Sequence, residues 1–138
     1  MAKARTELDS QELAREVARL ADTKLADDIV VLDMRDLVAY TDYLVIATAR
    51  NERQAKSIVD EVHHVLKREK GLLPVNPDRA GETGWSVLDY LDVVCHVFTE
   101  DARQTYDLEE LWHEAPRLEI QFETHEAHPV SAARSSGR

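Results

Sequence analysis

Cysteine is almost absent from this sequence: Cys95 is the single one among 138 residues. No disulfide can therefore form within the chain, which favours a reducing compartment, and we expect a cytoplasmic protein. Apolar residues surround Cys95 and would raise its thiol pKa, so a buried thiol is favoured over a nucleophile. The first residues lack the apolar core of a signal peptide. No apolar run is long enough to span a bilayer.

Basic and aromatic residues are also scarce. Lys and Arg number 17 against 27 Asp and Glu, which gives a formal charge of −10. Free binding to nucleic acid depends on a surplus of cations that this chain lacks, so little direct contact with nucleic acid is expected. An acidic chain matches a basic protein partner better. Aromatic residues make up only 6%, so Val, Leu, Ile and Ala must fill the core.

The sequence contains no pattern typical of a catalytic or cofactor site. A glycine-rich phosphate loop and a serine nucleophile elbow are both absent. The six histidines show no zinc-ligand spacing with Cys95. Asp89 and Asp92 follow a stretch with Gly81 and Gly84, which weakly resembles a nucleotidyltransferase, but such enzymes place their metal-binding carboxylates with one residue between them on one strand face. We therefore expect no metal and no cofactor.

Helical and strand patterns alternate through the first half of the chain. Asp9 or Ser10 is predicted to cap a first helix, and β-branched or apolar runs at 29–32 and 43–47 predict two strands. Asn51, with Gln54 three residues later, predicts the start of a second helix, and Gly71 predicts its left-handed end. Its expected apolar stripe consists of Ala55, Ile58, Val59, Val62, Val65 and Leu66.

The second half predicts further strands and short helices. Residues 72–75 could form a strand that Pro74 confines to a sheet edge, and 76–84 indicate a loop. Two strands are expected within 85–98, a helix capped by Thr99 or Asp101, a helical turn at 107–112 and a last strand at 117–122. The order predicts one α/β domain with a mixed sheet of about five strands. We place this domain at 10–116, after an arm at 1–9 and before a partly disordered extension at 117–138.

The stretch from Trp85 to Phe98 is the most informative part of the sequence. Its two apolar runs predict adjacent buried strands, with large side chains at their rims: Trp85, Tyr90, His96 and Phe98. Trp and Tyr supply contact area at low entropic cost, so a core hairpin that also carries a docking patch is one interpretation. Taken alone, the stretch favours the other interpretation, a plain core hairpin, since aromatic residues at strand ends are common in cores.

Several segments in one order make a resemblance specific. DDIVVLDMRDL at 27–37, TDYLVIATA at 41–49, NERQAKSIVDEV at 51–62, GWSVLDYLDVVCHVF at 84–98 and YDLEELW at 106–112 resemble the ribosomal silencing factor family, RsfS, also called Iojap-like. The resemblance implies a non-enzymatic factor that binds the large ribosomal subunit through ribosomal protein L fourteen. It would block joining of the small subunit and repress translation when nutrients are scarce. The implied fold is similar to a nucleotidyltransferase sheet without the catalytic apparatus.

The resemblance also implies which residues bind the partner: Trp85, Leu88, Asp89, Tyr90, Asp92 and His96. An apolar centre of Trp85, Leu88 and Tyr90 with Asp89 at its rim requires a bulge or twist near Ser86 or Val87, because Trp85 does not share a strand face with the other two. The family usually has glycine where this chain has Leu91. A residue other than glycine limits left-handed turn geometry, so Leu91 bears on the form of the hairpin.

Two other classes of function are weighed against this interpretation. One is an active, metal-dependent nucleotidyltransferase-like enzyme, against which the carboxylate spacing counts. The other is a homodimeric regulatory module with a different protein target. A silencing factor could also form a homodimer when it is off the ribosome.

Overall fold

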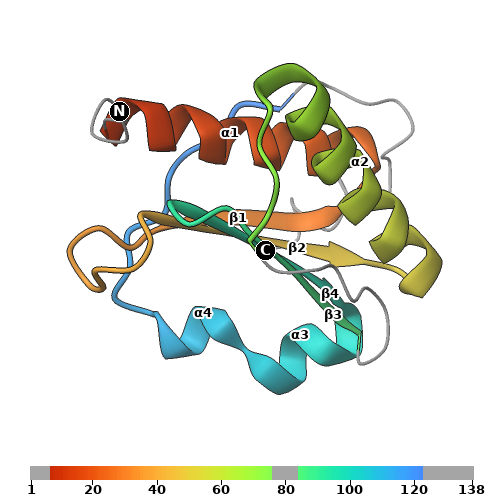
Figure 1. Ribbon diagram of the computed structural model, residues 1–138. Helices are drawn as coiled ribbons and strands as arrows, with labels where there is room; N and C mark the ends of the chain where they lie inside the picture. Colours follow the sequence, from red (N-terminus) through yellow and green to blue (C-terminus); the bar gives the residue numbers. More distant parts are fainter. Residues whose placement is uncertain (1–6, 76–83, 123–138) are drawn as a thin grey trace.

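A computed structural model describes residues 7–75 and 84–122. Most of the arm at 1–9, the loop at 76–84 apart from Gly84, and the tail after 122 lie outside the described residues. Within those residues, helices and strands alternate along one α/β domain (Figure 1). The elements are α1 Glu7–Thr23, β1 Asp27–Asp33, β2 Tyr43–Ala49, α2 Glu52–Lys70, β3 Trp85–Asp89, β4 Val93–Thr99, α3 Glu100–Tyr106 and α4 Leu108–Leu111.

The sheet is mixed, as predicted, but the described residues form four strands rather than about five. The strand order is β1-β2-β4-β3. β1 pairs antiparallel with β2, β2 pairs parallel with β4, and β4 pairs antiparallel with β3. The parallel pair needs a crossover, which α2 and the β3 hairpin supply.

The strands predicted at 72–75 and 117–122 are wrong. Each of these segments contacts the sheet through a few hydrogen bonds instead. In residues 72–75, Val75 N–H donates to the Asp89 carbonyl at 2.8 Å, while Pro74 has no N–H with which to extend a ladder. Residues 117–122 form one isolated bridge, Leu32 with Arg117. The segment then leaves β1 and runs beside α1, where Arg15 donates to the Glu119 carbonyl at 3.0 Å.

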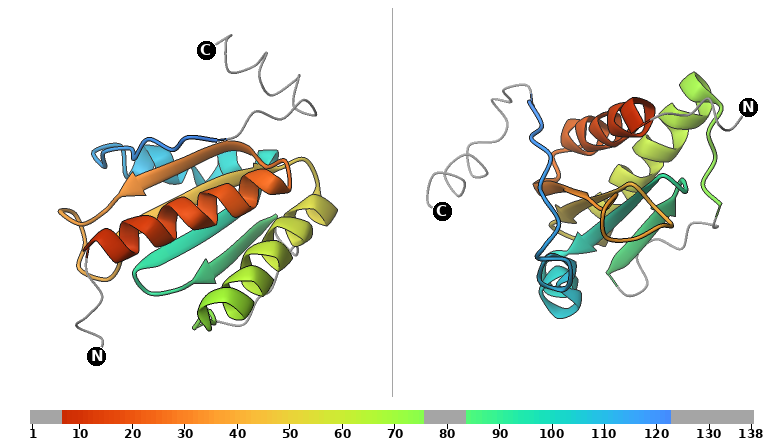
Figure 2. Two further views of the ribbon diagram at one scale, coloured as in Figure 1. Left: turned by 90° about the horizontal axis from the view of Figure 1, so that it is seen from above. Right: turned by 90° about the vertical axis from the view of Figure 1, so that its left-hand side faces the viewer.

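Helices cover both faces of the sheet (Figures 1 and 2). α1 and α2 pack on one face, which we call the upper face, and bury the larger core cluster. α3, α4 and the segment 34–42 lie at the opposite, lower face, where a smaller cluster includes Leu32, Ile46 and Phe98. The central strand β2 is buried at all seven positions. None of the described helices combines the length and apolarity needed to cross a membrane.

α2 matches its prediction at both ends. The Asn51 side chain accepts a hydrogen bond from Gln54 N–H at 2.8 Å. Gly71 ends the helix with φ 66°. The six residues predicted as its apolar stripe are all buried. The pattern was readable because capping and the helical period agree at every step.

α1 begins earlier than predicted. It starts at Glu7, so Asp9 and Ser10 lie inside the helix rather than at its cap, and residues 7–9 are helical rather than part of an arm. Ser10 is fully buried, which places it on the packed face of the helix. The local capping pattern therefore did not mark the true start of the helix. α3 is capped by Thr99, one of the two predicted residues.

The β3–β4 hairpin forms with Leu91 in the left-handed conformation, at φ 73°. Its tip consists of Tyr90, Leu91 and Asp92. The Asp89 side chain accepts a hydrogen bond from Leu91 N–H at 2.8 Å, and Tyr90 N–H donates to the Val93 carbonyl at 2.9 Å. Leu91 therefore occupies a left-handed position that glycine adopts more readily.

Two glycines with positive φ give a matched test of crowding. A Cβ at Gly84 would lie 2.6 Å from Thr99 Oγ1, whereas a Cβ at Gly71 meets nothing within 4 Å. Gly71→Ala should lose only the left-handed preference, roughly 1–2 kcal/mol of unfolding free energy. Gly84→Ala should lose about 3 kcal/mol, because the clash adds to the same strain. Urea unfolding of both variants measures the difference, and equal losses would show that the Thr99 contact is unimportant.

Candidate docking surface

The hairpin residues predicted as one patch face opposite sides of the sheet. β3 and β4 pair in continuous register from Trp85–Phe98 to Asp89–Val94, without a bulge at Ser86 or Val87. Leu88 is fully buried and Tyr90 is 4% exposed, and both belong to the upper core cluster. Trp85 packs on the lower cluster. The predicted bulge is therefore wrong, and β3 is a regular strand. The contribution of each residue to binding stays a prediction.

Trp85 is held on the lower face by a hydrogen bond and by aromatic contacts. Its indole N–H donates to His96 Nδ1 at 3.0 Å. Its ring centroid lies 4.5 Å from that of Tyr106 and 5.2 Å from that of Phe98. Trp85 and His96 are both half-buried, and Tyr106 is 42% exposed. An ordered aromatic surface therefore remains partly open to solvent on this face.

His96 must be neutral to keep this arrangement, because an indole N–H can donate only to a ring nitrogen that carries no proton. Burial lowers the pKa of His96 to about 4, while the negative charge of Asp89 opposes the shift. The pKa and the hydrogen bond agree on the neutral ring. His96 therefore fixes the orientation of Trp85 throughout the physiological pH range.

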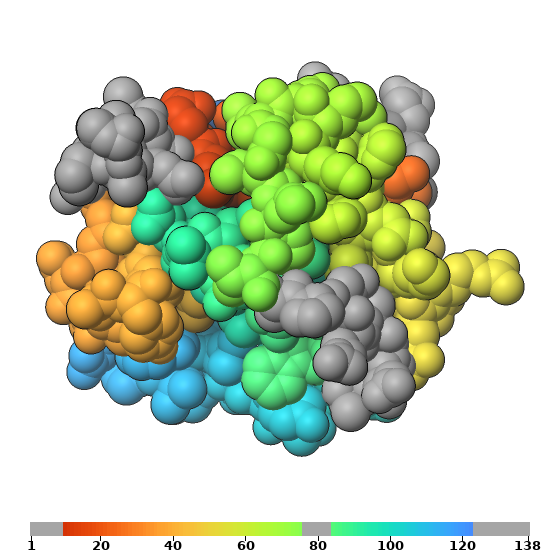
Figure 3. All heavy atoms as spheres, in the orientation of Figure 1, coloured from red at the N-terminus to blue at the C-terminus, as the bar shows by residue number. Residues whose placement is uncertain are grey.

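The hairpin tip is joined to the segment 34–42. The Asp92 carbonyl accepts hydrogen bonds from Asp42 N–H at 2.8 Å, from Thr41 Oγ1 at 3.0 Å and from Tyr43 N–H at 3.1 Å. In the space-filling view the orange 34–42 segment lies beside the green-blue hairpin (Figure 3). We call the hairpin-tip surface the exposed or half-buried set Tyr40, Asp42, Asp89, Leu91 and Asp92.

The two large, mainly apolar side chains of this surface were missed by sequence reasoning. Tyr40 is 68% exposed and Leu91 is 59% exposed. Tyr40 lies in a connection that the sequence marks only as polar, and its neighbourhood depends on the long-range bonds to Asp92. Leu91 was noted only as an unusual residue in a turn. Its exposure depends on the direction of the tip, which no local pattern specifies.

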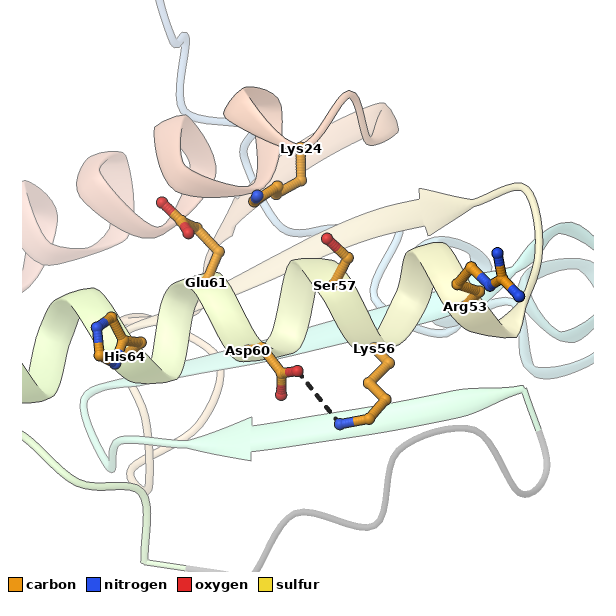
Figure 4. Close-up of a pocket in the computed structure, with 7 residues that line it drawn as sticks. All are labelled: Lys24, Arg53, Lys56, Ser57, Asp60, Glu61 and His64. Atoms are coloured by element: carbon orange, nitrogen blue, oxygen red, sulfur yellow. Dashed lines mark hydrogen bonds and ion pairs between the residues drawn. The ribbon is translucent and has the colours of Figure 1, made fainter.

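A hollow lies on the α2 side of the sheet (Figure 4). It is lined by Lys24, Arg53, Lys56, Ser57, Asp60, Glu61 and His64. Lys56 and Asp60 form an exposed ion pair at 3.2 Å, and such pairs stabilise little. Positive and negative groups alternate here, so the hollow favours neither an anion nor a cation.

The carboxylates considered as metal ligands have structural surroundings. Asp89 accepts the Leu91 N–H, and the Asp92 backbone anchors the segment 34–42. Across residues 7–75 and 84–122, no group of three or more His, Cys, Asp and Glu side chains could hold a metal ion. Burial raises the pKa of the Cys95 thiol to about 12, in keeping with the inert thiol predicted from its neighbours.

The depressed pKa of His96 gives a test with a defined sign. An unfolded histidine takes up a proton near its ordinary pKa of 6.5, whereas the folded one does so near 4. Above pH 6.5 His96 is neutral in both states and the free energy of unfolding has its full value. As pH falls from 6.5 towards 4, the unfolded state gains a proton that the folded state does not, so the free energy of unfolding decreases. His96→Gln removes the titration, so its Tm should fall less than that of the wild type between pH 7 and pH 5. The exposed His64→Gln is the control, and identical pH profiles for all three proteins would contradict the assignment.

Comparison with known proteins gives a consistent family. The family model described as "Ribosomal silencing factor during starvation" matches residues 7–138. The ribosomal silencing factor RsfS of Halalkalibacterium halodurans is 32% identical over 114 residues, which cover 83% of this chain and 97% of that protein. The RsfS of Bacillus subtilis is 31% identical with the same coverage. The chloroplastic Iojap protein of Arabidopsis thaliana is 33% identical over 83% of this chain, but this match spans 48% of that protein.

Solved structures show the same fold. A crystal structure of a protein from Bacillus halodurans superimposes with a TM-score of 0.67 at 32% identity, and covers 80% of this chain and 99% of that one. A crystal structure from Chromobacterium violaceum gives a TM-score of 0.66 at 28% identity, over 91% and 99% of the two chains. Sequence, family model and fold agree, and the chain belongs to the RsfS/Iojap family of ribosomal silencing factors.

Proposed function

We propose that this protein binds the large ribosomal subunit through ribosomal protein L fourteen, blocks joining of the small subunit and thereby represses translation when nutrients are scarce. Membership of the ribosomal silencing factor family supports a function on the ribosome. The proposed contact surface is the lower face of the β3–β4 hairpin together with its tip. Trp85, Asp89, Asp92 and His96 would line it, while Leu88 and Tyr90 would support the hairpin from the upper core.

The observation that carries the proposal is the incomplete cover of the lower face. α1 and α2 cover the upper face with long helices, whereas α3 and α4 span only 100–106 and 108–111. Trp85, Val87, Val94 and His96 consequently remain half-buried. A partly apolar sheet face with an ordered tryptophan matches the centre of a protein interface.

Charge supports a protein partner over nucleic acid. The net charge is −10, and three aspartates belong to the hairpin-tip surface: Asp42, Asp89 and Asp92. Such a surface would repel phosphates and attract a basic protein. Association should therefore be faster at low ionic strength.

Members of the family are ribosome-binding regulators and not enzymes. The surface proposed here needs no cofactor or metal, because its chemistry is contact and exclusion. Blocking would follow from occupation of the face on which the small subunit must dock. We place this activity in the cytoplasm; the plant relatives are named as chloroplastic or mitochondrial proteins.

Co-sedimentation tests the location of binding. The purified protein, mixed with isolated large or small subunits, should sediment with the large subunits and should reduce their joining to small subunits in a sucrose gradient. The physical reason is the match between its acidic, partly apolar face and a basic ribosomal protein. Equal sedimentation with both subunits, or with neither, would contradict the proposal. Gel filtration of the free protein would separately reveal a homodimer away from the ribosome.

A pair of isosteric variants locates the electrostatic contribution. Asp92→Asn and Asp60→Asn change the net charge equally, but Asp92 lies at the hairpin tip and Asp60 on exposed α2. Asp92→Asn should weaken binding to large subunits by roughly fivefold and flatten its salt dependence, because it removes a charge from the interface. Asp60→Asn should bind like the wild type. Equal weakening would show that only net charge matters, and no weakening by Asp92→Asn would exclude the tip.

A further inference from the structure

We propose that Leu91 is an apolar anchor that the hairpin tip presents to the same basic protein partner. This inference rests on the proposed function. The starting observation is a conflict at this residue. Leu91 adopts φ 73°, a conformation that costs a residue with a side chain free energy and that glycine adopts readily. Its side chain is nevertheless 59% exposed, so little packing within the domain offsets the strain.

The tip is rigid enough to hold Leu91 in this conformation. The Asp89 carboxylate accepts the Leu91 N–H at 2.8 Å on one side. On the other side, the Asp92 carbonyl accepts three donors from residues 41–43. Strained residues persist where the surroundings over-determine them, and such residues are concentrated at binding sites. A backbone held in place before binding also loses less entropy in a complex.

The surroundings of Leu91 indicate the chemistry of its partner. Tyr40, 68% exposed, precedes Thr41, whose hydroxyl is bonded to the Asp92 carbonyl. Leu91 and Tyr40 therefore supply apolar area at the end of the molecule where Asp42, Asp89 and Asp92 supply negative charge. The complementary surface is an apolar depression edged by Lys or Arg side chains. A ribosomal protein can present such a surface, whereas an RNA backbone cannot.

Three substitutions separate the side chain from the strain. Leu91→Ala keeps the backbone conformation but removes most of the side chain. Leu91→Gly removes the side chain and also relieves the strain. Leu91→Met keeps an apolar side chain of similar size that, like leucine, is not branched at Cβ. Each variant is measured by thermal unfolding and by co-sedimentation with isolated large subunits at one fixed salt concentration.

We expect opposite effects on stability and on binding. Leu91→Gly should raise the Tm by about 3 °C, because relief of strain exceeds the added freedom of the unfolded chain. It should also weaken binding by about fivefold or more, as for an anchor residue. Leu91→Ala should weaken binding similarly with little change in Tm. Leu91→Met should retain binding.

The outcomes distinguish this proposal from the one it rests on. If the wild type sediments with large subunits and the alanine and glycine variants do so equally well, the anchor is wrong while the proposed function stands. If the wild type does not sediment with them, the proposed function itself fails. A fall in Tm for Leu91→Gly would contradict the strain. A wild-type dimer that dissociates on Leu91→Gly would assign the tip to a second copy of this chain instead.

Discussion

The organisation of this domain depends on the burial of its central strand. β2 is buried at every position, so both faces of the sheet must be covered where β2 lies. Its parallel partner β4 requires a crossover, and α2 within that crossover covers the upper face together with α1. The lower face is covered by shorter pieces, α3, α4 and the segment 34–42. The cover therefore suffices for β2 but leaves the outer β3–β4 hairpin half-exposed.

A half-buried guanidinium holds the lower cover in place. Arg103 of α3 donates at 2.6 Å both to the Asp28 carbonyl of β1 and to Thr48 Oγ1 of β2. It also pairs with Glu109 of α4 at 3.1 Å, and Glu109 in turn pairs with Arg117 at 3.3 Å. Charge-assisted hydrogen bonds of this kind are the stronger ones in proteins. The Arg103 side chain thus connects the short helices α3 and α4, which would not be stable in isolation, to strands β1 and β2.

Much of the fold was predictable from local sequence, and the exceptions have physical causes. The Asn51 cap, the apolar stripe of α2 and the Gly71 end were readable because each is local. The segments 72–75 and 117–122 have strand-like composition, but whether they pair depends on the edge they meet. For the candidate site, the sequence indicated the hairpin and Trp85. It could not indicate Tyr40 or the true direction of Tyr90, because both depend on contacts between distant segments.

The contact between the chain after α4 and β1 has a consequence for the behaviour of the molecule in a crowded solution. Asp33 N–H donates to the Pro116 carbonyl at 2.7 Å, and Leu118 N–H donates to the Val31 carbonyl at 2.8 Å. Both groups lie on the outer side of β1, where an open strand edge would invite pairing with another chain. A single bridge closes these positions without adding a full strand. This contact thereby protects the β1 edge of the sheet against aggregation. The β3–β4 hairpin on the opposite side of the sheet stays available for contact.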